Sequence, residues 1–349
     1  MSNQVIGIDI GSRSVRAIEL RNPGAQNPSI SRFHEVALTA GSVRRGEVLE
    51  VATVASAIRR LWTTGGFTAK NVILGMGGPR VLSRDLVMPK APLWQIRESL
   101  PFHVGDMLPV PVSEALLDFY PISEENTDTG PGVKGLMIAV IKEAVAANVA
   151  AISQAGLRAV EVDLTPFALA RALAPVRSAR GLSAIISIGA NSTNVVVVLD
   201  GVPQFVRIIA SGGDDVSTAL ATRLQVTQLQ AEEIKKEVGL GFVGATAEQL
   251  VAISLAQELT SALLISLRDT LAFYIQSHPG SQFESIILSG GGSKLTGLAR
   301  ALGQLVAIPI EQNPALTRAQ LSVGSKSRST PEQLEAMTTA YGLALGTTL

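Results

Sequence analysis

The sequence predicts an α/β protein built from two similar halves that face one another across a cleft. Two β-rich hairpins half a chain apart carry this prediction: Ile8-Asp9-Ile10-Gly11 matches Ile186-Ser187-Ile188-Gly189, and Ser14 matches Ser192. A third glycine cluster, Gly290 to Gly292, follows a predicted strand and precedes a predicted helix. Glycines let a backbone approach a ligand closely, and a helix N-terminus favours phosphate. The three loops together therefore favour a phosphate-bearing ligand.

The first hairpin carries a single carboxylate, Asp9. Because side chains alternate along a strand, Ile6, Ile8 and Ile10 share one face and Asp9 lies on the other, between two glycines. A tight turn beside a carboxylate is a plausible seat for a phosphate chain and its metal ion. Taken alone, the stretch also fits an ordinary hairpin with an incidental acid. The second hairpin and the third glycine cluster favour the phosphate interpretation.

Composition narrows the class of protein. The chain of 349 residues is long enough for two or three domains. Its 29 basic and 29 acidic side chains balance, so the basic footprint of a non-specific nucleic-acid binder is missing. It has no cysteine, which excludes disulfides, thiolate zinc sites and cysteine nucleophiles. With neither a signal peptide nor an uncharged apolar stretch of ~20 residues, we expect a cytoplasmic protein.

The first part of the chain is expected to form three strands, a helix and a strand, followed by a small inserted α+β subdomain over residues 79–145. In the insertion we expect a helix from Trp94 to Met107 broken by Pro101, and an exposed loop from Glu124 to Lys134. Later, a helix from Thr246 to Ser277 should place a leucine stripe in the core. The best boundary between the halves lies at 175–181.

The order of these features resembles the actin, Hsp70 and sugar-kinase ATPase superfamily, in which two phosphate hairpins flank an insertion and an adenosine loop follows. Within it, the chain resembles the PilM family, which comprises actin-like, FtsA-related cytoplasmic proteins of type IV pilus assembly. The single insertion stands where FtsA-like proteins carry their 1C subdomain, which argues against Hsp70 and sugar kinases. The resemblance covers nearly the whole chain, and its more specific motifs are Val162 to Leu169, Gly189 to Asn194, Ser211 to Asp215, Ala231 to Lys236, Leu288 to Leu298 and Ala340 to Gly346.

This resemblance implies two actin-like (ribonuclease H-like) halves around a nucleotide cleft, with an FtsA-like 1C insertion. Each half would contribute its own hairpin to one nucleotide. The implied subdomains are 1A (1–78 and 146–176), 1C (79–145), 2A (177–213 and 278–349) and 2B (214–277).

The resemblance also implies that the cleft binds ATP or ADP with Mg²⁺. Asp9 would hold the nucleotide-bound Mg²⁺ through water, since this ion favours carboxylates and retained waters. Glu232 and Lys235, three apart on a predicted helix, would lie at the ribose and adenine, unless they form a solvated surface pair. Arg13 is either a phosphate contact or an exposed turn charge. The other implied contacts are Gly11, Ser12 and Ser14 in the first hairpin; Gly189, Ala190, Asn191, Ser192 and Thr193 in the second; Gly212 and Gly213 before a helix; and Gly290, Gly291, Gly292, Ser293 and Lys294 at the base.

The second hairpin departs from the pattern of hydrolysing relatives. Ser187 and Asn194 stand where many of those relatives carry an acid. Metal-assisted hydrolysis needs charge neutralisation and an oriented water. We therefore expect nucleotide binding with slow or absent hydrolysis, and no residue is assigned a catalytic role.

By resemblance, the protein would be a nucleotide-dependent scaffold that docks the N-terminal cytoplasmic peptide of the inner-membrane protein PilN. The groove would lie between the first domain and the insertion, and the membrane would be reached only through partners. Pilus motor ATPases and a second copy of the chain are further candidate partners. One alternative is a small-molecule kinase, for which no acceptor site or general base is evident. The other is a filament-forming division protein like FtsA, although we expect this chain to lack the basic amphipathic membrane helix with which such proteins end.

Overall fold

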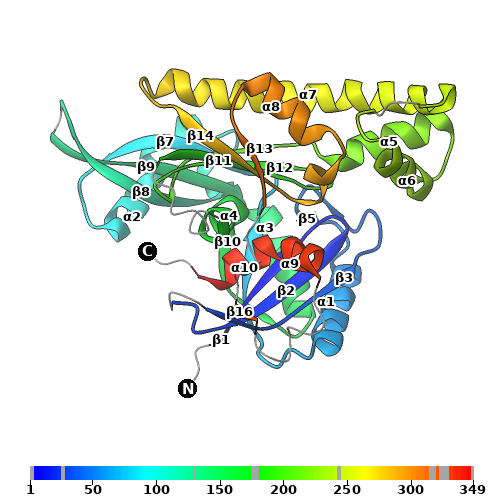
Figure 1. Ribbon diagram of the computed structural model, residues 1–349. Helices are drawn as coiled ribbons and strands as arrows, with labels where there is room; N and C mark the ends of the chain where they lie inside the picture. The colour runs from blue at the N-terminus through cyan, green and yellow to red at the C-terminus, as the bar shows by residue number, and fades with distance from the viewer. Residues whose placement is uncertain are drawn as a thin grey trace.

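The structure is a computed structural model that describes residues 4–24, 28–128, 130–173, 181–241, 245–313, 320–321 and 330–346. Two sheets lie one above the other, each with helices on its outer face, and a third, smaller sheet lies to one side (Figure 1). The predicted α/β architecture of two similar halves is confirmed. The predicted boundary at 175–181 falls almost wholly outside the described residues.

The first sheet has the strand order β10-β6-β1-β2-β3-β16. Ile6, Ile8 and Ile10 face helices α1 and α3, as the alternation predicts, while Gly7 faces the other side. Helix α1 ends where Gly66 adopts a left-handed conformation (φ 67°). The strands are β1 Gln4–Ile10, β2 Ser14–Arg21, β3 Ser29–Ala37, β6 Asn71–Met76, β10 Arg158–Leu164 and β16 Gln320–Leu321, and the helices are α1 Val51–Gly65, α3 Lys142–Gln154, α4 Thr165–Leu173 and α10 Thr338–Ala344; β4 Val43–Arg44 and β5 Glu47–Val48 form a separate short pair.

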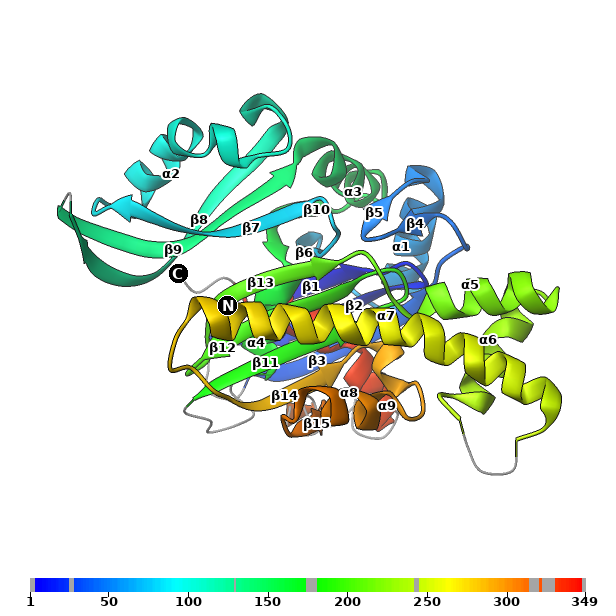
Figure 2. The ribbon, with the colours of Figure 1, turned by 90° about the horizontal axis from the view of Figure 1, so that it is seen from above.

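The second sheet has the order β13-β12-β11-β14-β15 and repeats the pattern of the first. In both halves an antiparallel hairpin, β1–β2 or β11–β12, has a parallel strand beside its first member. Helix α7 runs along the outer face of this sheet, beside α8 (Figures 1 and 2). The elements are β11 Leu182–Ile188, β12 Thr193–Leu199, β13 Val202–Ile209, β14 Phe283–Ser289, β15 Ile310–Gln312, α5 Gly213–Leu224, α6 Gln228–Val238, α7 Ala247–Ser277, α8 Leu298–Val306 and α9 Pro331–Ala336.

Helix α7 matches the predicted long helix. Of its leucine stripe, Leu263, Leu267 and Leu271 are buried against the second sheet, while Leu255 and Leu259 pack partly buried beside α5 and α6. Residues Gln249–Ser277 also have the length and mean hydropathy (1.7) of a membrane-crossing helix, although charged residues interrupt the stretch. A helix packed on a sheet often has the same composition. The sequence prediction of no membrane-crossing stretch considered only uncharged segments, so it did not weigh this one.

The insertion forms a three-stranded sheet, β7-β9-β8, with α2 on it (Figure 2). The expected loop from Glu124 to Lys134 is wrong, because β8 and β9 stay paired as far as Thr127 and Gly130. The strands of this arm are held by main-chain hydrogen bonds and do not need a buried face. Their side chains are therefore mostly polar and lack the alternation of apolar and polar residues that predicts a strand. The expected break at Pro101 is also wrong: α2 continues to His103, since Pro101 removes only one N–H close to the helix end. The elements are β7 Val81–Pro89, β8 Ala115–Thr127, β9 Gly130–Ile141 and α2 Leu93–His103.

Helix α10 packs against the first sheet, although the resemblance assigned its residues to subdomain 2A. It lies against α4 and β1, and Leu343 is fully buried with Ile73 and Ala168. Backbones meet closely here, because a Cβ at Gly7 would lie 2.1 Å from the Ala340 carbonyl oxygen. The subdomain division as a whole stays a prediction.

We predict that Gly342→Ala destabilises the protein by about 3 kcal/mol, because overpacking forces backbone to move. The added methyl would lie 1.8 Å from the carbonyl oxygen of Ala168. Gly24→Ala is the matched control, since a methyl at this glycine meets nothing within 4 Å. Urea unfolding measures both variants, and equal midpoints for the two would contradict the predicted packing.

Candidate functional site

A cavity of about 850 Å³ lies between the two halves. Both hairpin turns, the N-terminus of α5, one face of α6 and the third glycine cluster line it. Of the sequence-predicted residues, two do not line the cavity. Thr193 donates a hydrogen bond to the Ser211 carbonyl (2.8 Å), and Ser293 donates one to the Gly290 carbonyl (2.7 Å). Both side chains therefore stabilise the glycine loops instead of facing the cavity. The lining residues among those predicted are Asp9, Gly11, Ser12, Arg13, Ser14, Gly189, Ala190, Asn191, Ser192, Gly212, Gly213, Glu232, Lys235, Gly290, Gly291, Gly292 and Lys294.

The glycine loops of the second half pack directly on one another. The amides of Gly213 and Asp214 donate to the carbonyls of Gly189 (2.9 Å) and Ala190 (2.7 Å). A Cβ at Gly212 would lie 2.6 Å from both of those carbonyl oxygens. Gly290 has a φ of 81°, and a Cβ there would lie 2.4 Å from the Ile188 carbonyl oxygen. Glycine is therefore required by these contacts, which also engage the first amides of α5, those of Gly213 and Asp214.

Asp9 faces an arginine that the sequence analysis did not single out. Asp9 and Arg16 are cross-strand partners in the first hairpin, and their side chains form an ion pair at 3.6 Å. Arg16 also donates to Glu35 (2.9 Å). Burial raises the pKa of the Asp9 carboxyl, which the Arg16 guanidinium offsets only in part. The opposite-charge pair in hairpin register was the signal that could have revealed Arg16.

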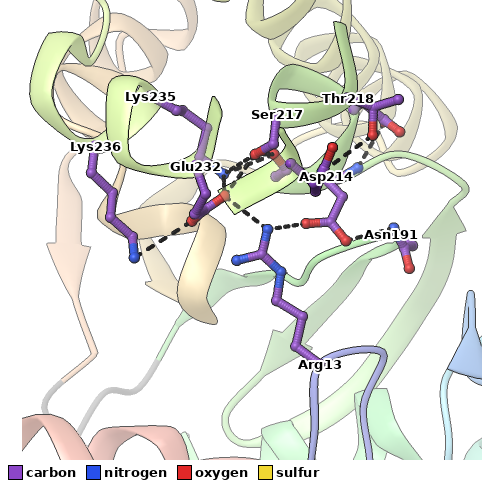
Figure 3. A network of polar contacts seen from close by, with 12 residues as sticks. Arg13, Asn191, Asp214, Ser217, Thr218, Glu232, Lys235 and Lys236 are labelled. Atoms are coloured by element: carbon purple, nitrogen blue, oxygen red, sulfur yellow. Dashed lines mark hydrogen bonds and ion pairs between the residues drawn. The ribbon is translucent and has the colours of Figure 1, made fainter. Parts of the chain in front are cut away.

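Arg13 does not lie flat on the first hairpin; its side chain crosses to the second half (Figure 3). It pairs with Asp214 in the first turn of α5 and donates to Glu232 on α6 (2.8 Å). Asp214 also accepts a hydrogen bond from Asn191 (3.1 Å). Arg13 therefore joins three segments through these contacts, and its contact with a phosphate stays a prediction.

Glu232 and Lys235 share one face of α6, as their spacing predicts, and they form an ion pair at 2.7 Å. Burial acts to raise the pKa of the Glu232 carboxyl, but hydrogen bonds from Arg13 and Lys235 outweigh it and hold the pKa well below its ordinary value. Burial lowers the pKa of the Lys235 ammonium, and the neighbouring Glu232 carboxylate, which raises it, offsets this only in part. The ammonium contacts Glu232, Ser217 and the Gly213 carbonyl within 2.9 Å, and this geometry suits the charged form.

Three buried oxygen atoms in the cavity wall have no hydrogen-bond partner within the described ranges: Ser14 Oγ, Asn194 Oδ1 and Thr260 Oγ1. They come from the first hairpin, the second hairpin and α7. Leaving a buried polar atom unpaired is costly, so a partner that is not part of the chain is expected. All three atoms belong to residues that line one cavity, so both halves have hydrogen-bonding capacity there that the described chain does not use.

We predict that Glu232→Gln lowers the free energy of unfolding by about 1–2 kcal/mol at neutral pH, because charge-assisted hydrogen bonds are lost. The pKa of the Glu232 carboxyl is lower in the folded than in the unfolded protein, where it is about 4.3. Its charged form therefore stabilises the folded state above about pH 4.3, and this contribution is lost as the pH falls towards the folded-state pKa. The gap between variant and wild type should therefore narrow below about pH 4. Glu143→Gln, at an exposed ion pair, is the control. A gap that persists unchanged to pH 3 would contradict the assignment.

Comparison with known proteins identifies the family. The profile of the type IV pilus assembly protein PilM matches residues 7–348. A chain from a PilM-PilN type IV pilus biogenesis complex is 26% identical, with a TM-score of 0.81, and the match covers 99% of this chain and 98% of that chain.

More distant structures share the fold alone. The ethanolamine utilization protein EutJ from Carboxydothermus hydrogenoformans is 15% identical (TM-score 0.57; 99% and 90% of the two chains covered). MreB5 of Spiroplasma citri, bound to AMPPNP, is 12% identical (TM-score 0.54; 98% and 95% covered). These similarities confirm the actin-like architecture, and the profile match covers nearly the entire sequence. The chain belongs to the type IV pilus assembly protein PilM family.

Proposed function

We propose that this protein is a nucleotide-binding scaffold of type IV pilus assembly that docks the cytoplasmic N-terminal peptide of PilN at the inner face of the cytoplasmic membrane. The observation that carries the proposal is the 26% identity, over nearly all of both chains, to a member of a PilM-PilN complex. Motor ATPases and self-association stay predictions of the resemblance. The kinase and filament alternatives are not favoured, since the family profile and this structural match both point to pilus assembly.

The cavity suits a nucleotide. Its volume of about 850 Å³ lies in the range of small-molecule sites. Arg16, Lys235 and Lys294 line it, each paired with a carboxylate that a phosphate group could replace. The unpaired oxygens of Ser14 and Asn194 can bond to phosphate or ribose groups. The superfamily fold is shared with an AMPPNP-bound MreB5. We infer that ATP or ADP occupies the cavity, with its phosphates between the two hairpins.

Magnesium would arrive with the nucleotide. Asp9 is the carboxylate of the first hairpin, and in the described part of the chain no cluster of three His, Cys, Asp or Glu side chains could hold a metal ion. A single carboxylate suits an ion that keeps its waters and bridges phosphate oxygens. Asp9 would orient those waters, and the ion would neutralise phosphate charge.

The structure gives a physical basis for slow hydrolysis. Ser187 and Asn194 are cross-strand partners in the second hairpin, so this position has no carboxylate on either strand. The nearby acids are already engaged: Asp215 accepts from Ser211 and from the Gly212 amide, and Asp214 binds Arg13. Both acids at the start of α5 are therefore already engaged by other groups, which supports slow hydrolysis.

We predict that Ser14→Ala weakens nucleotide binding about tenfold, the effect of losing one hydrogen bond to a charged group. Because Ser14 Oγ has no partner within the described chain, the substitution should leave the free energy of unfolding unchanged. Titration with a fluorescent ATP analogue measures the affinity, and Ser123→Ala, an exposed serine of β8, is the control. Equal affinities for both variants would count against this cavity as the nucleotide site.

We predict steady-state ATP turnover below ~1 per second, slower than ordinary enzymes. Phosphate release under saturating ATP and Mg²⁺ measures it. Turnover at or above that rate would contradict slow hydrolysis.

The docking groove for PilN is proposed between the first sheet and the insertion. Strand β10 ends the described first sheet, and Val160 and Val162 on it are 52% and 40% exposed. An extended peptide can add to such an edge while apolar side chains anchor it.

We predict that a synthetic PilN N-terminal peptide binds saturably in calorimetry, and that Val160→Glu weakens binding at least tenfold by placing a charge against an apolar anchor. Val202→Glu, a comparably exposed valine of the second half, should bind like the wild type. Absence of saturable binding to the wild type would refute the partner, and an unaffected Val160→Glu would refute this edge as the groove.

A further inference from the structure

A second cavity, here called the outer cavity, adjoins the nucleotide cleft. It measures about 1160 Å³ and lies between the loop Leu38 to Arg45 of the first half and helices α5 and α6 of the second. Both cavities have Arg13, Asp214 and Glu232 in their walls. The ion pairs of Arg13 therefore form a partition between the cleft and the outer cavity.

The partition joins the two halves of the molecule. Arg13 comes from the first hairpin, and its two carboxylate partners come from α5 and α6 (Figure 3). Within the described ranges, no other ion pair links residues 4–173 to residues 181–277. The Asp214 and Glu232 side chains are 20% and 14% exposed, but the Arg13 side chain is 44% exposed, so dissolved ions can reach the bridge and screen it.

The outer cavity carries positive charge that the partition does not use. Arg44 and Arg45 on the first half and Arg223 at the end of α5 line it and are exposed. None of the three has an ion-pair partner in the part of the chain that the structure describes. Asp215 also lines the outer cavity without an ion-pair partner among the described residues, so the unpaired charge is net positive. Such charge raises the local concentration of an anionic ligand. A nucleoside triphosphate, which is anionic, would therefore be attracted to the outer cavity.

We propose that the Arg13–Asp214–Glu232 bridge is a latch across the mouth of the nucleotide cleft, and that it opens for nucleotide to pass through the outer cavity. The inference rests on the proposed nucleotide function and names the regulation of that same site. The closed latch holds the first hairpin against α5 and α6, so it limits exchange of bound nucleotide. Its strength depends on ion pairs, so raised salt should speed exchange in the wild type more than in a variant without Arg13.

The latch can be tested without nucleotide. The sequence contains no cysteine, so Ala40→Cys and Leu229→Cys place two spin labels on opposite walls of the outer cavity. We expect one narrow interlabel distance in the wild-type background and a longer or broader distribution in Arg13→Ala. The double variant Arg13→Asp with Asp214→Arg should restore the narrow distribution. Identical distributions with and without Arg13 would overturn the latch, whether or not nucleotide binds.

Exchange is tested with a fluorescent ATP analogue as the bound probe and excess ATP as the chase. Arg13→Ala should release the probe about tenfold faster, as expected for losing charge-assisted hydrogen bonds. Arg97→Ala, which removes a similar arginine–carboxylate pair from the insertion, is the matched control. The charge-swapped double variant should release the probe more slowly than either single change. Unchanged release in Arg13→Ala would overturn gating, whereas no probe binding to any variant would overturn the proposed nucleotide function.

Discussion

The close backbone packing of the second hairpin turn fixes the geometry of the whole cleft. Gly212 and Gly290 leave no room for a side chain against the carbonyls of residues 188–190, so the N-terminus of α5 and the third glycine cluster sit directly on that turn. This contact fixes the position of Asp214 at the start of α5. Because α5 packs on α6, it also fixes the position of Glu232. Arg13 can reach both acids only because that chain of contacts ends opposite the first hairpin.

The two halves have the same topology, but their hairpins carry different polar residues at the matching positions. The first hairpin keeps a carboxylate and places an arginine opposite it, while the second presents Ser187 and Asn194 at paired positions. Charge on the second half comes instead from α5 and α6, where Asp214, Glu232 and Lys235 are already paired with neighbours or with Arg13. An arrangement with its acids occupied suits holding a ligand more than transforming it.

Features encoded by local pattern could be predicted from the sequence. The two hairpins, α7 and the one-faced pair on α6 all follow from alternation or helical spacing within a short window. The β8–β9 arm could not, because its main-chain pairing does not require apolar side chains. The direction of Arg13 was likewise hidden, since its partners lie about two hundred residues away. Arg16 could have been predicted, because the register of the first hairpin places it opposite Asp9 and opposite charges on paired strands attract.

The place of α10 has a consequence for how the chain is made. Residues 338–344 pack against β1, whose Gly7 lies against the backbone of Ala340. The core of the first half is therefore built from segments more than three hundred residues apart, and closing so long a loop has an entropic cost. During synthesis, the face of β1 that α10 covers stays open until residues 338–344 have left the ribosome. Through that interval the nascent first sheet exposes apolar surface, the condition under which molecular chaperones engage a growing chain.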